Sequence, residues 1–157
     1  MYGNTALPGC EVGAEERHAG SIWRGYTEAT WFKLVKVGGS GEEATPIPQG
    51  TIMIEDGTTG KFKAFATSDI ISAVANLPGG RLGIIADTTA MTGTTTTVDG
   101  ESQTVDATVL IGIQGQVDKA KLLVGETAFG NLEDAQKINL ERQLEGWNFQ
   151  LVEVTEG

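Results

Sequence analysis

The sequence predicts a mostly β protein with one helix near its C-terminus, arranged as a small open barrel and preceded by an extended N-terminal arm. Short apolar and β-branched runs recur between Gly- and Pro-containing turns from Gly50 onward, as in proteins with many short strands. Only one stretch, residues 132–144, has the periodicity of an amphipathic helix. The first 30 residues are rich in glycine and charge, which favours an arm over a core.

The length of the chain indicates a single domain with appendages. A chain of 157 residues is about one domain's worth, and 39% of its residues are hydrophobic. We expect residues 1–30 to form the arm and residues 31–49 to form a strand followed by a Gly- and Pro-containing linker. Residues 50–157 then form the β-rich domain.

Large apolar side chains gather where the arm joins the rest of the chain. Two interpretations remain open for them. They could pack on the protein's own core, or they could anchor the arm on a partner, since large aromatic residues often anchor interfaces. As a partner-binding set, the candidates are Ile22, Trp23, Tyr26, Trp31 and Phe32.

The first strands follow from alternation and turn residues. Residues 31–37 alternate as a strand, and the glycines of residues 38–41 break it into a connector. Residues 51–54 and 61–65 are two further strands. The Asp-Gly and Gly residues between them, within 55–60, favour a tight turn.

The middle of the sequence predicts two strands separated by an exposed tract. Residues 69–76 have the length of one or two helical turns, and a buried strand follows at residues 81–86. Residues 87–103 contain seven threonines and no aromatic residue, which indicates an exposed loop or hairpin. Residues 104–113 are the most strand-like run, and residues 117–124 continue the sheet after a break at Gly115.

The C-terminal region predicts the helix and a last strand. Asn131 stands at the expected N-cap, with an acidic residue three positions later. The helix then extends over residues 132–144 with one apolar stripe, and Gly146 ends it. Residues 147–151 return to the two-residue alternation of a strand.

The net charge of the chain limits the classes of partner that we expect. The formal net charge of −10 gives a surface that repels phosphate, so we expect neither nucleic acid nor an anionic membrane as partner. No apolar run approaches the roughly 20 residues that span a bilayer, and the N-terminus lacks the pattern of a signal peptide. These features predict a soluble protein made in a cytoplasm.

The sequence predicts no enzyme and no cofactor. Cys10 and His18 are the only residues of their kinds, and they are eight positions apart in a stretch without periodicity. The loop carboxylates are explained by turns and solvated strand faces rather than by acid–base catalysis. A calcium site combining Asp99 and Glu101 with Asp87 or Asp106 is a weaker alternative, because the spacing of a dedicated calcium loop is absent.

From Pro48 to Val154 the order of features resembles the head decoration proteins of lambda-like phages. The residues that carry the resemblance include Ile47–Thr51, Asp56–Lys61, Gly83–Ala86, Val105–Val109 and Gly115–Asp118, followed by the capped helix and last strand. The resemblance implies a β-clip-like fold and a homotrimer that binds the exterior of a capsid at local three-fold axes. It also implies that the arm orders against the major capsid protein and helps to hold neighbouring capsomers against DNA pressure. The expected location is therefore the virion exterior.

Two other classes of protein remain as alternatives. A carbohydrate- or receptor-binding module of a phage tail or adhesin would also be β-rich, with many glycines and threonines. A nucleotide hydrolase of β-clip architecture ranks last, because its metal- and phosphate-binding groups are absent from this sequence.

Overall fold

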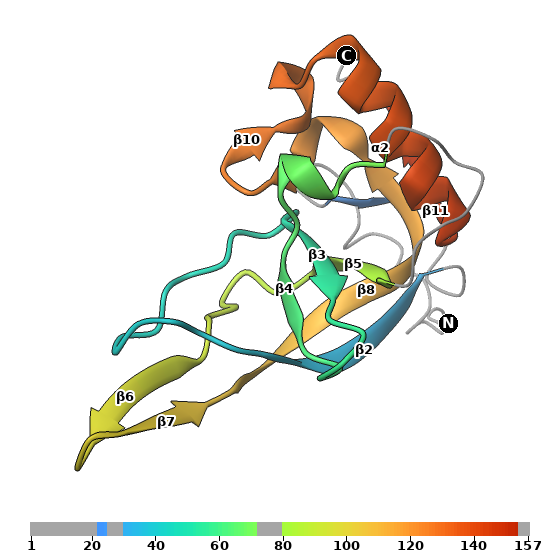
Figure 1. Cartoon of the computed structure of the whole chain (residues 1–157). Coiled ribbons are helices and arrows are strands. Elements are labelled where there is room, and N and C mark those ends of the chain that lie inside the picture. The colour runs from blue at the N-terminus through green and yellow to red at the C-terminus, as the bar shows by residue number, and fades with distance from the viewer. Residues whose placement is uncertain (1–21, 25–29, 72–79, 154–157) are drawn as a thin grey trace, which may run out of the picture.

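The computed structural model describes residues 22–24, 30–71 and 80–153, and this part of the chain is mostly β with one α-helix near the C-terminus. Five strands close into a small barrel in the order β8-β2-β4-β3-β5 (Figure 1). The barrel is closed, not open as predicted, because β8 pairs with β2 along one edge and with β5 along the other. The five strands are β2 (Trp31–Val37), β3 (Ile52–Glu55), β4 (Phe62–Ala64), β5 (Leu82–Ile85) and β8 (Ala107–Asp118).

Strand β8 is long enough to belong to two parts of the molecule. Its first eight residues pair with β2 in the barrel. Its last residues pair in parallel with β11 (Phe149–Val152) and antiparallel with β1 (Trp23–Arg24). The predicted break at Gly115 was wrong, because the strand continues through this residue. Gly115 has a φ of 147°, a backbone conformation that a glycine adopts without steric cost.

Two hydrophobic cores lie on the two faces of the barrel wall. Alternating side chains of each strand point inward or outward. The inner core fills the barrel with Val35, Val37, Ile47, Met53, Phe62, Ile85, Ala90, Val109 and Ile111. The outer core joins the outside of β3 and β5, including Ile52 and Ile84, to side chains of β1, β11 and the helix.

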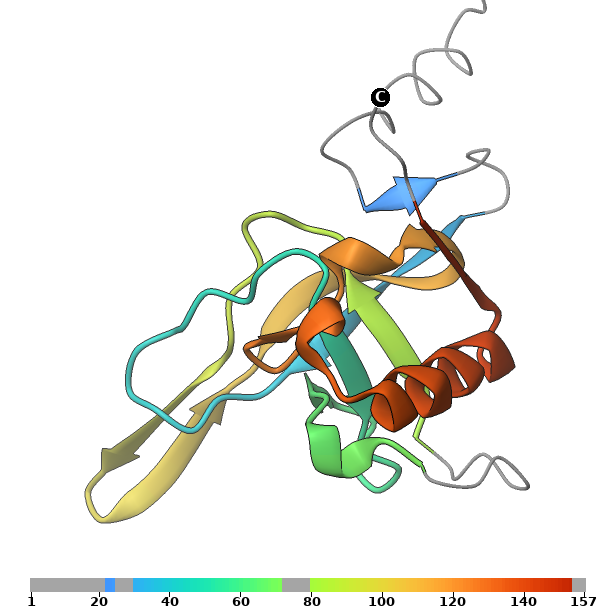
Figure 2. The same ribbon diagram turned by 90° about the horizontal axis from the view of Figure 1, so that it is seen from above.

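The helix α2 (Asp134–Gly146) covers the outer core (Figure 2). Leu140 and Leu144 are its fully buried side chains. The predicted start at Leu132 with Asn131 as N-cap was wrong by two residues. Glu133 is the N-cap, and its backbone N–H donates to Oε1 of Gln136 at 3.1 Å. Asn131 is instead the last residue of a 3₁₀ turn, Phe129–Asn131, which precedes the helix.

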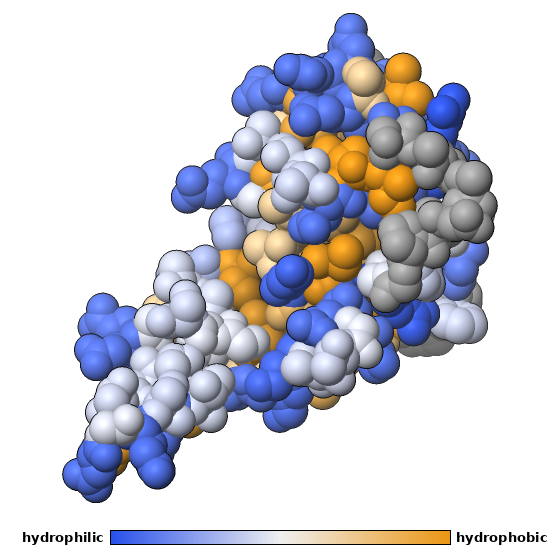
Figure 3. Space-filling model, in the orientation of Figure 1, coloured by the Kyte–Doolittle hydropathy of each residue, from blue (hydrophilic) through white to orange (hydrophobic). Residues whose placement is uncertain are grey.

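A two-stranded hairpin projects from one end of the barrel (Figures 1 and 2). It consists of β6 (Thr94–Val98) and β7 (Glu101–Val105), joined by Asp99 and Gly100. Both turn residues have positive φ, as a two-residue hairpin turn requires. The threonine tract is therefore a regular exposed hairpin, one of the two predicted forms. Its surface is polar, in contrast to the apolar residues visible at the centre of the same view (Figure 3).

The Gly-containing segment after β2 is fixed to the base of the hairpin. The backbone N–H of Thr95 donates to the carbonyl of Gly41 at 2.8 Å, and that of Thr92 donates to the carbonyl of Thr45 at 2.8 Å. The hydroxyl of Thr95 also donates to the carbonyl of Gly39. These bonds order a segment that its composition alone predicts to be a connector.

Short elements complete the described part. Strands β9 (Leu123–Val124) and β10 (Thr127–Ala128) form a small hairpin before α2. A 3₁₀ turn occupies Thr67–Asp69 and another occupies Lys119–Lys121. The helical turns predicted at 69–76 fall largely outside the described residues. None of the helices in the described ranges has the length and apolar character needed to cross a bilayer.

Candidate docking surface

An exposed apolar strip runs along the outer face of β2. Val35 and Val37 point into the barrel and are buried, so the alternate residues Phe32, Leu34 and Lys36 point outward. Phe32 is 40% exposed and Leu34 is 65% exposed. Barrel exteriors that face water usually carry polar residues at such positions. We call Phe32 and Leu34 the β2 strip; Trp31, at the N-terminal end of the strand, is 56% exposed and alternates to the other face.

The strip is continuous with the outer core. Across the sheet, Ile84 of β5, Gly112 of β8 and Phe32 of β2 lie in one row of paired residues. Ile84 is fully buried under the second layer, whereas Phe32 is partly open to solvent. The outer apolar face of the barrel therefore extends beyond the part that α2, β1 and β11 cover.

Trp23 marks the border between the covered and the open part. Its ring lies over Gly112, so close that a Cβ at that position would overlap it. The indole meets the ring of Phe32 edge to face, with centroids 5.4 Å apart. The side chain that ends the covered core is thus in direct contact with the β2 strip.

The structure separates four of the five predicted arm residues into two groups. Ile22 and Trp23 are buried in the outer core, at 2% and 4% exposure, which corresponds to the interpretation that they pack on the protein itself. Trp31 and Phe32 are exposed on β2. Tyr26 and residues 1–21 lie outside the described residues, so the extended arm stays a prediction.

Leu34 is a surface residue that the sequence prediction did not include. The signal was present in the alternation of β2, because buried valines at positions 35 and 37 place position 34 on the opposite face. Its partner across β8 is Leu110, which is half-buried. The pair extends the apolar surface from Phe32 along the barrel.

One lysine stands beside the strip. Lys36 is exposed on the same face as Leu34 and donates from Nζ to the hydroxyl of Thr108 at 2.9 Å, whereas Lys33 alternates to the opposite face. The whole chain carries a net charge of −10, so Lys36 is a local exception beside an apolar surface. Such a surface is complementary to an apolar patch bordered by carboxylates.

Two carboxylates in loops stabilise turns of the backbone. Oδ1 of Asp56 accepts hydrogen bonds from the backbone N–H groups of Thr58 at 2.8 Å and Thr59 at 3.3 Å, which lowers the pKa of Asp56. Oδ1 of Asp87 accepts from the N–H and the hydroxyl of Thr89, both at 2.8 Å, which lowers the pKa of Asp87. Both aspartates stabilise local chain reversals.

The alternative calcium site is not assembled. Asp99 lies in the hairpin turn and Asp106 lies at the hairpin base, roughly 20 Å apart by the rise of a strand. Asp106 instead pairs with Lys61, with 3.0 Å between Oδ2 and Nζ. Among the described residues, no three His, Cys, Asp or Glu side chains come together as metal ligands would. Cys10 and His18 lie outside the described residues.

The chain has no match among known protein family models, curated proteins or solved structures.

Proposed function

We propose that this chain is a non-enzymatic capsid decoration protein that binds the exterior of a phage head. In this proposal the barrel is β-clip-like, and three copies occupy a local three-fold site and stabilise the head against internal DNA pressure. The observation that carries the proposal is the β2 strip, an open extension of a core located where the N-terminal segment joins the barrel. The resemblance of the order of sequence features to that of phage decoration proteins supports the same proposal.

The major capsid protein is the occupant that we propose for the β2 strip. An exposed apolar surface with Lys36 beside it favours a partner surface with an apolar centre and a carboxylate at its edge. Trp23, which contacts Phe32 of the strip, follows residues 1–21 directly after Ile22 in the sequence, so we propose that the strip and this segment bind one partner together. Three copies acting together would combine modest contacts into firm attachment.

Co-sedimentation with expanded, undecorated heads tests this function. Full-length protein should bind saturably. A truncation should remove residues 1–21 and no more, because Ile22 and Trp23 belong to the outer core. This truncation should weaken binding if the segment contributes, while thermal melting stays close to that of the full chain. Absence of binding by the full-length protein would refute the decoration function.

The double variant Phe32→Ser, Leu34→Ser tests the β2 strip itself. Both side chains are exposed, so the fold should persist while binding to heads falls about tenfold or more. Val105→Ser on the hairpin is the matched control, because Val105 is 68% exposed and lies far along the chain from the strip. A variant that loses its self-association instead of its head binding would identify the strip as a subunit interface.

One observation favours the second candidate function, a carbohydrate- or receptor-binding module. A groove lined by amide side chains lies between β8, β11 and the end of α2.

A further inference from the structure

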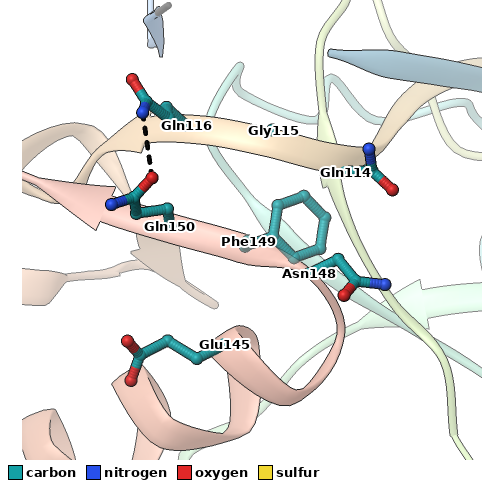
Figure 4. Close-up of a pocket in the computed structure, with 7 residues that line it drawn as sticks. All are labelled: Gln114, Gly115, Gln116, Glu145, Asn148, Phe149 and Gln150. Carbon is teal, nitrogen blue, oxygen red and sulfur yellow. Dashed lines mark hydrogen bonds between the residues drawn. The ribbon is translucent and has the colours of Figure 1, made fainter. Parts of the chain in front are cut away.

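The groove has a volume of ≈ 510 Å³ and opens to solvent between the second half of β8, the start of β11 and the last turn of α2 (Figure 4). Five of its seven lining residues are polar, namely Gln114, Gln116, Glu145, Asn148 and Gln150. Among the side chains that the structure describes, no lysine or arginine lines it. We propose that this groove is a binding site for a neutral saccharide. This inference goes beyond the decoration function and does not depend on it.

The wall formed by β8 and β11 holds two of the amides in a fixed pair. Gln116 and Gln150 are register partners on parallel strands. Nε2 of Gln116 donates to Oε1 of Gln150 at 2.9 Å. An amide has both donor and acceptor capacity, so Oε1 of Gln116 and the NH₂ group of Gln150 can still bind a ligand. The pair therefore presents one acceptor and one donor side by side.

The opposite wall is a tight turn between α2 and β11. Asn148 has a φ of 70°, a conformation that asparagine adopts more readily than most residues. Its backbone N–H donates to the carbonyl of Glu145 at 3.0 Å, and its carbonyl accepts from the N–H of Gly115 at 3.3 Å. These bonds tie the turn to β8. They set the backbone positions of Glu145 and Asn148 relative to the glutamines.

The lining chemistry selects the class of ligand. Four amides and one carboxylate offer donors and acceptors together, which suits adjacent hydroxyl groups that both donate and accept. Glu145 carries the only charge among the described lining side chains, and its carboxylate disfavours phosphorylated and other anionic ligands. Bound peptides are held by apolar side-chain pockets or by a strand edge. A lining that is polar at five of seven residues fits a saccharide better.

Trp31 is the neighbour, on the adjacent strand, of one residue that lines this groove. It is the register partner of Gln114 across β2 and β8, so the two side chains are neighbours on one face of the sheet. Its indole is 56% exposed. An aromatic surface beside hydrogen-bonding groups matches a sugar ring, which has both C–H faces and hydroxyl edges.

Screening of the labelled full-length protein on an array of neutral and sialylated oligosaccharides tests the proposal. We expect saturable binding to one or more neutral structures. The double variant Asn148→Gly, Gln150→Ala should weaken the best interaction about tenfold or more in a calorimetric titration. Glycine keeps the positive φ that position 148 requires, so the turn should survive. Gln103→Ala, an amide on the exposed hairpin, is the matched control and should bind normally.

Three results would overturn the proposal: no binding on the array, exclusive binding of sialylated structures, or equal binding by the groove variant and the control. A peptide from a random library that binds the natural chain but binds the groove variant more weakly would also overturn the proposal, because the ligand of the groove would then be a peptide. The groove variant should co-sediment with heads like the full-length protein. Loss of saccharide binding alone therefore leaves the decoration function intact, and the reverse result leaves the groove intact.

Discussion

Gly112 is the residue on which the position of Trp23 depends. A Cβ at this position would overlap the indole ring, so Gly112→Ala should force Trp23 away from the outer core. We expect the free energy of unfolding to fall by about 1–3 kcal/mol, as in overpacked cores. Chemical denaturation measures the loss, and a red shift of tryptophan fluorescence would report the exposed indole.

Gly130→Ala is the control for this substitution. No atom lies within 4 Å of the Cβ that it would introduce, and its backbone φ is not in the positive range. Its stability should stay within about 0.5 kcal/mol of the natural chain, as for most surface changes. Equal stability of the Gly112 and Gly130 variants would argue against the placement of Trp23 over β8.

The carboxylate of Asp56 makes a pH-dependent contribution to the stability of the folded chain. Two backbone N–H groups bind its carboxylate, so its pKa in the folded chain lies below the ordinary value of 3.8. A lowered folded pKa contributes stability above the unfolded pKa, and this contribution is lost as the pH falls through the folded pKa. Asp56→Ala should therefore melt at a lower temperature than the natural chain at pH 7. The difference should shrink below pH 3.8.

Melting curves between pH 7 and pH 2 test this prediction. Asp99→Gly is a useful control, because glycine keeps the positive φ of the hairpin turn. A melting difference for Asp56→Ala that stays constant down to pH 2 would mean that the carboxylate charge does not matter.

Single residues also show what the sequence could predict about the docking surface. Trp31 and Phe32 were predicted as candidates from residue type, and both are exposed. Trp23 has the same residue type, yet it is buried, because β1 pairs with the far half of β8 and brings it over Gly112. Residue type therefore identifies large aromatics, but long-range pairing decides which of them reach the surface.

At the scale of elements, the β6–β7 hairpin stands apart from both cores. None of its ten strand residues belongs to either hydrophobic cluster, and all five residues of β7 are exposed. An isolated two-stranded ribbon is marginally stable in water, so its base must hold it. The hydrogen bonds of Thr95 with Gly39 and Gly41 provide that attachment.

Shortening this hairpin should leave the barrel intact. In the variant, a two-residue Asn-Gly turn replaces residues 96–103. It connects Thr95 to Thr104, which are register partners in the hairpin. Because the removed residues bury no core, the melting temperature should change by no more than about 4 °C. Thermal melting by circular dichroism measures this. A large cooperative loss would show that the hairpin packs on part of the molecule beyond its base.

The helix shows where local signals compete. The residue type of Asn131 predicted it as the N-cap, but Glu133 occupies that position in the structure. In the structure, Leu132 is buried and Phe129–Asn131 forms a 3₁₀ turn before the helix begins. Packing of the apolar residues that precede the helix thus overrides the preference for asparagine at the cap.

At the scale of the whole molecule, the net charge predicts that the protein does not bind nucleic acid. The chain carries −10 at pH 7, and DNA binding requires cations that displace the counterions of phosphates. We expect no retention of duplex DNA in filter binding at 50 mM salt. The two lysines of β2 should not be sufficient. Saturable retention that weakens as salt rises would contradict this and require a basic surface on residues outside the described part.

Local patterns determined most of the elements of this protein. Alternation and turn residues located β2, β3, β4, β5 and β11 within a few residues, because strand periodicity and Gly or Asp-Gly turns act over short distances. Composition likewise identified the exposed threonine tract, which is too polar to be buried.

Tertiary structure alone decided how these elements close and which surfaces stay open. The barrel closes because β8 pairs with β2 along one edge and with β5 along the other, and the far end of β8 pairs with β1 and β11. No local pattern encodes those partners. The same pairings bury Trp23, expose Phe32 and Leu34, and bring Gln116 beside Gln150 across 34 positions of sequence. Contacts between distant segments depend on the packing of the whole chain, so the docking strip and the groove become visible only in the folded molecule.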